Sequence, residues 1–202
     1  MTESLKLNQS ESNEETTSNI EFKRQQVMLS FIEKGLITED FYKSGAIEVF
    51  DIDNNLGRDA LLHMLVGDEY GGAHHIPSIM ALDSSPVRIA SLSQDDGRLR
   101  RTYSKGDLRR EQTERSNGVF KSLDVLVVDD EGRELQKSGG SVMFPNDWNT
   151  EKVIRAVIKV SQVPGEIRQD NHAIKHIAKV DDVQIIVVTD IISGKILTGF
   201  PK

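Results

Sequence analysis

The spacing of hydrophobic residues divides the chain into a helical part and a strand-rich part. Residues 21–34 space their apolar side chains as an amphipathic helix would, and Gly35 follows as a stop signal. Thr38, followed by two acidic residues, is typical of the capped start of a second, short helix. From residue 87 onward, short apolar runs alternate with turn residues, and this pattern predicts strands.

The strand-rich part also contains one predicted helix. Residues 149–160 place apolar side chains on one face, with Asn149 or Thr150 as the cap. Helices first and antiparallel hairpins afterwards predict an α+β fold. The predicted strands span residues 87–92, 119–128, 133–137, 141–144, 183–192 and 195–200.

The segment 168–179 carries His172 and His176 four residues apart, and we predict one or two helical turns there. On a helix, this spacing can chelate a metal ion. However, no Glu stands where a zinc-protease helix needs one, and two ligands make an incomplete site. We therefore interpret the segment as a solvated helix face, and we predict neither a metal site nor a cofactor.

Three of the five histidines lie in the stretch 63–75. The preceding residues 56–66 have helical apolar spacing, with two asparagines before them as cap candidates. This helix places His63 in its last turn, and Gly67 supplies the stop. The alternative interpretation of such a histidine is a satisfied cap or a half-buried core residue.

A glycine pair follows the first of these histidines. Gly71 and Gly72 allow a tight backbone path that can bring His74 or His75 back toward His63. Two imidazoles facing one space suit proton transfer near neutral pH, because unperturbed histidine titrates near pH ~6.5. One ring can act as a base while the other acts as an acid, so we predict a catalytic centre here.

The composition places the chain among globular proteins. Of its 202 residues, 37% are hydrophobic and 28% are charged, and no apolar stretch approaches the length of a membrane span. The absence of cysteine excludes disulfides and cysteine-based zinc sites. A net charge of -7 argues against a protein that coats nucleic acid by bulk electrostatics, but it allows a local basic patch.

We predict three segments along the chain: a disordered leader at 1–20, a helical segment at 21–55 that packs on the catalytic body, and a catalytic domain at 56–202. The leader is rich in Ser, Thr, Asn and Glu and poor in apolar residues. The run 98–115 holds seven basic and three acidic residues. Its arginines and Tyr103 suit an RNA groove, and a solvated loop is the alternative.

Five motifs occur in a fixed order between residue 56 and the end of the chain, and together they resemble the bacterial EndoU endoribonucleases. The family pattern differs from this sequence at Val142, where threonine is usual, and at Phe200, where tyrosine is usual. The motifs are His63-Met-Leu-Val-Gly67, Gly72-Ala-His-His75, Asn117-Gly-Val-Phe120, Lys137 with Ser141-Val-Met-Phe-Pro-Asn-Asp-Trp148, and Gly194-Lys-Ile-Leu-Thr-Gly-Phe-Pro201.

The resemblance implies a fold related to ribonuclease A, with amino-terminal helices and two antiparallel sheets. It also implies cleavage of RNA by transesterification, in which the 2′-OH attacks and a 2′,3′-cyclic phosphate forms. His63 and His74 align with the catalytic histidines. Lys137 has the charge and reach to stabilise the phosphate oxygens in the transition state. The expected substrate-binding residues are Ser141, Thr198, Phe200 and His75.

The partners that follow from the resemblance are RNA, including tRNA with a uridine bias, and a cognate immunity protein. The chain is then a toxin domain that acts in the cytoplasm of its own or a target cell, after delivery as part of a longer protein. Two other classes stay open. The string Ala73-His-His-Ile-Pro77 also resembles the start of a metal-dependent HNH-type toxin nuclease, and a non-catalytic binding module is the third class.

Overall fold

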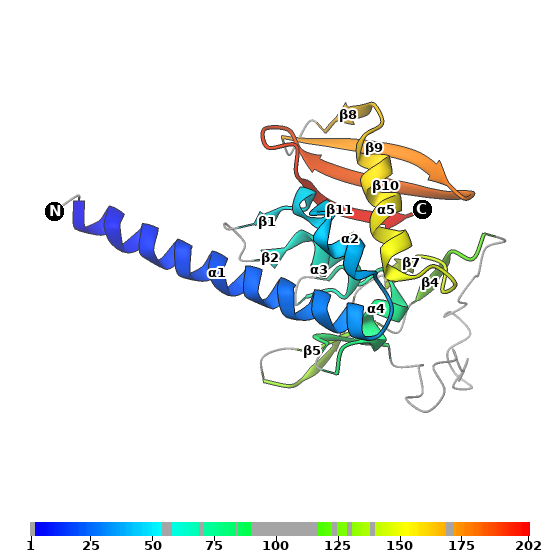
Figure 1. Cartoon of the computed structure of the whole chain (residues 1–202), viewed down its shortest axis with the longest axis horizontal. Helices are drawn as coiled ribbons and strands as arrows, with labels where there is room; N and C mark the ends of the chain where they lie inside the picture. Colours follow the sequence, from blue (N-terminus) through cyan, green and yellow to red (C-terminus); the bar gives the residue numbers. More distant parts are fainter. Residues whose placement is uncertain are drawn as a thin grey trace.

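Helices come first in the chain and antiparallel strands follow (Figure 1), which confirms the predicted α+β class. The computed structural model describes residues 3–53, 58–68, 71–83, 85–89, 117–122, 125–128, 131–137, 140–168 and 172–202. The predicted basic groove at 98–115 lies outside these residues.

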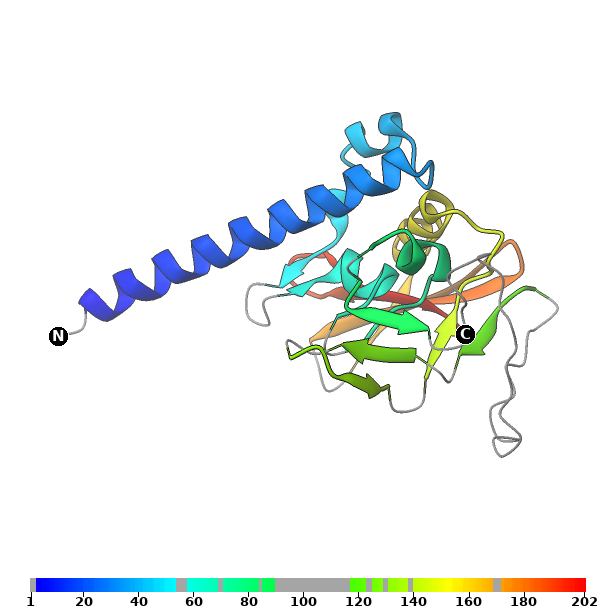
Figure 2. The ribbon, with the colours of Figure 1, turned by 90° about the horizontal axis from the view of Figure 1, so that it is seen from below.

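The amino-terminal part consists of helices α1 (Glu3–Glu33) and α2 (Glu39–Lys43) and the 3-10 helix η1 (Ala46–Val49). Thr38 caps α2 as predicted, since its side chain accepts a hydrogen bond from the Phe41 amide at 3.2 Å. Helix α1 is longer than predicted and continues through the expected leader, extending away from the body (Figures 1 and 2). No glycine or proline interrupts the sequence before Gly35, so nothing breaks the helix earlier.

Two short strands and two short helices hold the histidine stretch. Strands β1 (Ile52–Asp53) and β2 (Arg58–Asp59) pair antiparallel, and α3 (Ala60–Leu65) and α4 (Ile76–Met80) follow. The cap of α3 is Asp59, whose carboxylate accepts from the Leu62 amide at 2.9 Å. The prediction of an asparagine cap at residue 54 or 55 was therefore wrong, because strand β2 directly precedes the helix and its last residue, Asp59, is the cap.

The carboxy-terminal part is built around one four-stranded antiparallel sheet. Its order is β11 (Ile196–Pro201), β10 (Val183–Asp190), β9 (Ala173–Val180) and β8 (Gly165–Ile167). Helix α5 (Thr150–Ser161) covers one face of this sheet (Figure 1). Asn149 caps α5 as predicted, by accepting from the Lys152 amide at 2.8 Å.

The helical turns predicted over 168–179 are wrong, because residues 173–180 form strand β9. Strand β9, Ala173–Val180, pairs with β10 along its whole length and with β8 near its start. Pairing with strands on both sides therefore determines the structure of this segment and overrides its local helical propensity. His176 lies in the strand, where its Nδ1 contacts the Val163 carbonyl at 2.7 Å and its Nε2 contacts the Thr189 hydroxyl at 2.9 Å.

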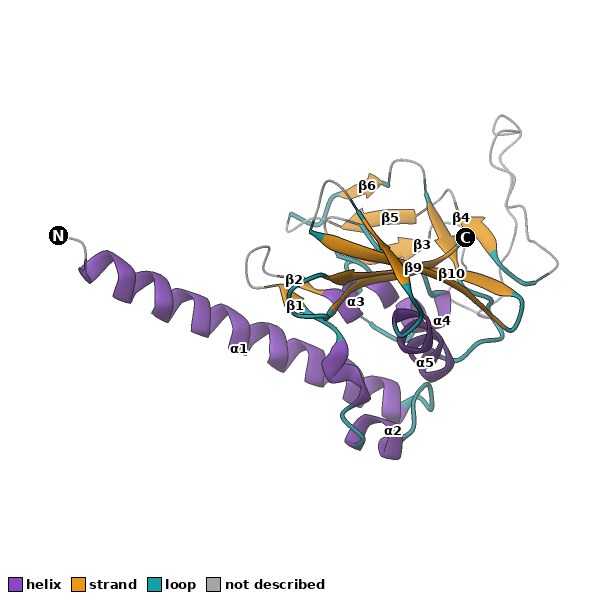
Figure 3. Ribbon diagram, turned by 90° about the horizontal axis from the view of Figure 1, so that it is seen from above, coloured by secondary structure: helices purple, strands orange, loops and turns teal. Residues whose placement is uncertain are grey.

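Two smaller sheets complete the body (Figure 3). One joins β3 (Val87–Ile89), β5 (Val125–Val128) and β6 (Glu134–Gln136), and the other pairs β4 (Phe120–Ser122) with β7 (Ser141–Met143). The single strand predicted over 119–128 is thus two strands in different sheets.

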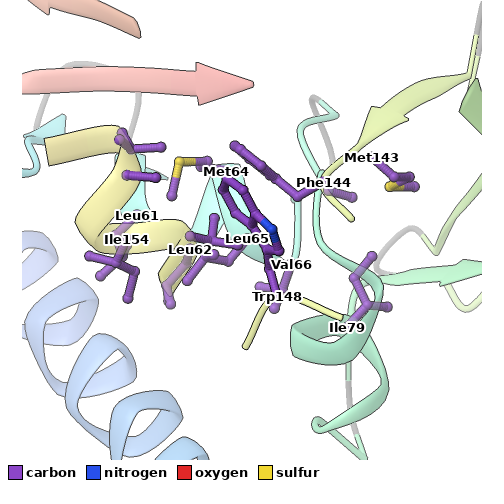
Figure 4. Packing of buried hydrophobic residues seen from close by; sticks show 14 of the residues in the cluster. Leu61, Leu62, Met64, Leu65, Val66, Ile79, Met143, Phe144, Trp148 and Ile154 are labelled. Atoms are coloured by element: carbon purple, nitrogen blue, oxygen red, sulfur yellow. The ribbon is translucent and has the colours of Figure 1, made fainter. Parts of the chain in front are cut away.

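Helix α3 lies within the hydrophobic core (Figure 4). All its residues except His63 are buried, and Leu61, Leu62 and Leu65 pack near Trp148 and other large side chains. Full burial of each such leucine contributes about 1.5–3 kcal/mol, so the position of α3 is strongly determined. His63 is the one side chain that this helix presents toward solvent. None of the helices in the described part of the chain is long and apolar enough to cross a membrane.

Candidate active site

His63 is half-buried in the last turn of α3, as the sequence predicts. Its Nδ1 lies 2.8 Å from the Oδ2 atom of Asp68. Because a carboxylate only accepts, the hydrogen in this contact belongs to Nδ1, and the pair becomes an ion pair when the ring is protonated. Asp68 thereby fixes the orientation of the ring, and the other ring nitrogen, Nε2, takes no part in this contact.

The loop after α3 folds back onto the helix. The Ala73 amide donates to the His63 carbonyl at 3.0 Å, and the His74 amide donates to the Met64 carbonyl at 2.9 Å. Gly67 has a φ of 80° and Gly72 a φ of 70°, values that favour glycine. The predicted tight path therefore exists, and it brings His74 toward His63.

His74 is oriented by a strand of the small sheet. Its Nδ1 lies 2.7 Å from the carbonyl oxygen of Val142 in β7, so Nδ1 donates and Nε2 carries the free lone pair. Burial lowers the pKa of His74 to about 4; the bond to Val142 opposes this, and the charges of Lys137 and His63 add to it. At neutral pH the ring is uncharged and can accept a proton.

Lys137 is half-buried directly after β6 and points at the same loop. Its Nζ donates to the Gly72 carbonyl at 2.7 Å and to the Ser141 hydroxyl at 2.6 Å. Burial lowers the pKa of this ammonium, and the negative charge of Asp68 opposes that effect. An ammonium has three hydrogens, so the third can donate to an anion.

Ser141 lies inside the structure rather than on a substrate surface. Only 3% of it is exposed, and its hydroxyl donates to the Gly72 carbonyl at 2.9 Å while it accepts from Lys137. Direct contact of Ser141 with the substrate stays a prediction; in this structure the hydroxyl holds the lysine in place.

His75 is also buried, with 0% exposure. Its Nδ1 contacts the Ser78 hydroxyl at 2.6 Å, and its Nε2 contacts the Trp148 carbonyl at 2.9 Å. Burial lowers the pKa of His75 to about 4. With both ring nitrogens used and no exposed surface, His75 stabilises the core. This placement argues against the substrate-binding role predicted from the sequence.

Thr198 and Phe200 stand two residues apart on β11, so their side chains share one face of the sheet. Both are partly exposed. The centre of the Phe200 ring lies 5.6 Å from that of His74, with the planes tilted by 31°. The last strand therefore brings an aromatic ring next to one histidine of the site, with the Thr198 hydroxyl on the same face of the sheet.

Sequence reasoning missed two groups that orient the histidines. Asp68 follows directly after the predicted stop Gly67, so an acidic residue beside the histidine motif was a usable signal. The carbonyl of Val142 gave no signal, because any residue supplies a carbonyl oxygen. Among the described residues, no three His, Asp or Glu side chains gather in a way that could hold a metal ion.

Two histidines within electrostatic reach of each other, with a lysine beside them, are the groups that general acid-base catalysis next to a cation requires. The family model described as "Bacterial EndoU nuclease" matches residues 57–202. The match covers more than half of the chain, which therefore belongs to the bacterial EndoU nuclease family. No curated protein and no solved structure gives a match.

Proposed function

We propose that this nuclease cleaves RNA through the 2′-OH of the nucleotide before the cut, and that His63, His74 and Lys137 carry the reaction. The observation that supports this most is the different setting of the two histidines. His74 has an uncharged ring with Nδ1 held by Val142, whereas His63 has its Nδ1 held by the carboxylate of Asp68. One suits a base and the other an acid.

In the proposed reaction, Nε2 of His74 takes the proton of the 2′-OH. The freed oxygen attacks phosphorus, and the bond from phosphorus to the 5′-oxygen breaks. Nε2 of protonated His63 gives its proton to that leaving oxygen. The products are a 2′,3′-cyclic phosphate and a free 5′-OH. Lys137 faces the negative charge that develops on the non-bridging oxygens, where a fixed cation contributes most.

The proposed mechanism uses no metal ion, because RNA carries its own nucleophile and no water has to be activated. Family membership and the resemblance described above support the biological part of the proposal. We infer that the chain is a toxin domain that acts on RNA, including tRNA, with a uridine bias, inside its own or a target cell. A cell that makes such an enzyme needs an immunity protein that blocks it.

One experiment tests the proposal against both alternatives. Labelled RNA, DNA, and RNA with a single 2′-deoxyribose at the cut are incubated with the chain, with and without excess chelator. We expect cleavage of RNA alone, unchanged by chelator, with a cyclic phosphate end. DNA cleavage that a divalent metal restores would favour the HNH class. Binding without cleavage under all conditions would favour the non-catalytic module.

A further inference from the structure

The four-stranded sheet has a second face that does not belong to the core. Ile185 and Val187 of β10 are core residues, and a Cβ at Gly199 would lie 2.8 Å from Val157 of α5. Because side chains alternate along a strand, Ile186 and Phe200 point to the opposite face. Ile186 is buried but is not a member of the core cluster.

Strand register places this second face in rows that end at the catalytic site. Ile177 of β9 pairs with Ile186 of β10, which pairs with Phe200 of β11. Phe200 contacts the His74 ring, whereas Ile177 at the other end is 40% exposed. An apolar strip thus runs from the catalytic histidine across three strands to an open edge of the surface.

Two lysines flank this strip. Lys175 and Lys179 lie two residues on either side of Ile177, so all three share one face of β9. Among the described residues, no ion pair engages either lysine. Four residues of strand span about 13 Å. In a chain with a net charge of -7, the two lysines bring positive charge to the face that carries Phe200, and they outnumber Glu166 of β8, which lies opposite Lys175 on that face.

We propose that Lys175, Ile177, Lys179 and Phe200, with the buried Ile186 between the two apolar side chains, form a platform for the RNA strand that flanks the cut. The accessible side chains of the row, Ile177 and Phe200, support base faces, and the two ammonium groups bind backbone phosphates, which is how proteins hold single strands. Charge complementarity and continuity with the catalytic histidine select RNA over a protein segment as the occupant. The inference rests on the proposed function and extends it to the nucleotides beyond the cut.

The test compares the double variant Lys175→Ala/Lys179→Ala with the native chain on two substrates with the same cut site, a dinucleotide and a decanucleotide. The native chain should have a higher kcat/KM for the decanucleotide than for the dinucleotide. In the double variant the ratio of these two values should be about tenfold smaller. The control is Lys23→Ala/Lys159→Ala. It removes the same charge from exposed positions on α1 and α5, and should keep the preference.

A binding measurement separates this inference from the function on which it rests. Fluorescence anisotropy with a decanucleotide that has 2′-deoxyribose at the cut needs no catalysis. The logarithmic salt slope of the binding constant should become shallower by about 1.4 in the double variant, about 0.7 for each lost phosphate contact. Equal slopes and equal length preference in the native chain and the double variant would overturn the platform and leave cleavage intact. Lysine-dependent binding without any cleavage would support the platform while the proposed reaction failed.

Discussion

Gly72 lies so close to His63 that a Cβ carbon added to Gly72 would stand 1.9 Å from the His63 carbonyl oxygen. The same carbonyl accepts the Ala73 amide, and the Gly72 carbonyl accepts both Lys137 and Ser141. The glycine therefore joins the helix that carries one histidine to the loop that carries the other. The two nearest atoms are the carbonyl oxygen and carbon of His63, and a backbone carbonyl cannot swing aside as the end of a flexible side chain could.

We expect Gly72→Ala to abolish RNA cleavage, because the added carbon forces the loop away from α3 and separates His63 from His74. Gly35→Ala is the matched control. It has a similar φ of 68°, but nothing lies within 4 Å of the added carbon. It should keep full activity and lose about 1 kcal/mol of stability. An active Gly72→Ala enzyme would mean that the loop geometry does not determine catalysis.

Alanine at His63, His74 or Lys137 should each lower kcat/KM by at least about two orders of magnitude, since base, acid and charge stabiliser each contribute on that scale. The losses should not add in double variants, because the three groups act as a unit. His75→Ala is the informative comparison. It should lower stability while the folded fraction stays active, and the reverse pattern would move the catalytic role from His74 to His75.

Stability should fall in acid because of His75. Burial lowers its pKa from 6.5 to about 4, so between these values the unfolded chain binds more protons than the folded one. The free energy of unfolding therefore falls as the pH falls through this window, by about 2 kcal/mol at pH 5 for this residue alone. Urea midpoints at pH 7 and pH 5 measure the effect.

His75→Gln should show about half of the native pH dependence, because the pKa of His74 is also lowered to about 4 and contributes the other half. His172→Gln changes an exposed histidine outside both environments and serves as the control. If the difference between pH 7 and pH 5 is the same in all three proteins, His75 is not buried as an uncharged ring.

Arg24 joins the amino-terminal helix to the helix of the active site. It is 8% exposed, pairs with the α3 cap Asp59, and donates to the carbonyls of Phe50 and Asp51. Arg24→Ala leaves a buried carboxylate without its cation, which should cost about 3–5 kcal/mol of stability in thermal or urea unfolding. Lys43→Ala breaks the exposed pair with Glu39 and should change little. Equal effects of the two variants would contradict a structural role for α1.

The parts of this site that the sequence could predict are those encoded within short stretches. The position of His63 in the last turn, the stop at Gly67 and the tight path through Gly72 all follow from local spacing. The capping residue Asn149 follows from the same kind of signal. Lys137 was predicted as a site residue only because it belongs to a motif. An isolated lysine carries no local information about the loop that it contacts.

The parts that could not be predicted depend on residues far apart in the chain. His75 and His74 are neighbours, yet only His75 is sealed, because its ring meets the carbonyl of Trp148 73 positions later. Ser141 is turned inward by a carbonyl of residue 72. His176 occupies a strand because β10 pairs with it, although its local sequence favours helical turns.

The last prediction concerns Phe200, which stands where the family pattern that the sequence resembles has tyrosine. The ring lies next to His74 and can stack on a base, whereas a tyrosine would add a hydroxyl able to bond the phosphate or orient a catalytic group. Stacking contributes about 1–3 kcal/mol per base, and a neutral hydrogen bond contributes about 0.5–1.5 kcal/mol.

Phe200→Ala should therefore lower kcat/KM more than Phe200→Tyr raises it, and the loss should vary with the base at the cut. The measurement uses oligonucleotides that differ only in that base, with Phe22→Ala on α1 as a control that removes an exposed ring far along the chain. Unaltered kcat/KM for Phe200→Ala on every oligonucleotide would show that the ring does not touch RNA. The platform would then lose its connection to the candidate site, because Phe200 is the residue through which the apolar row reaches His74.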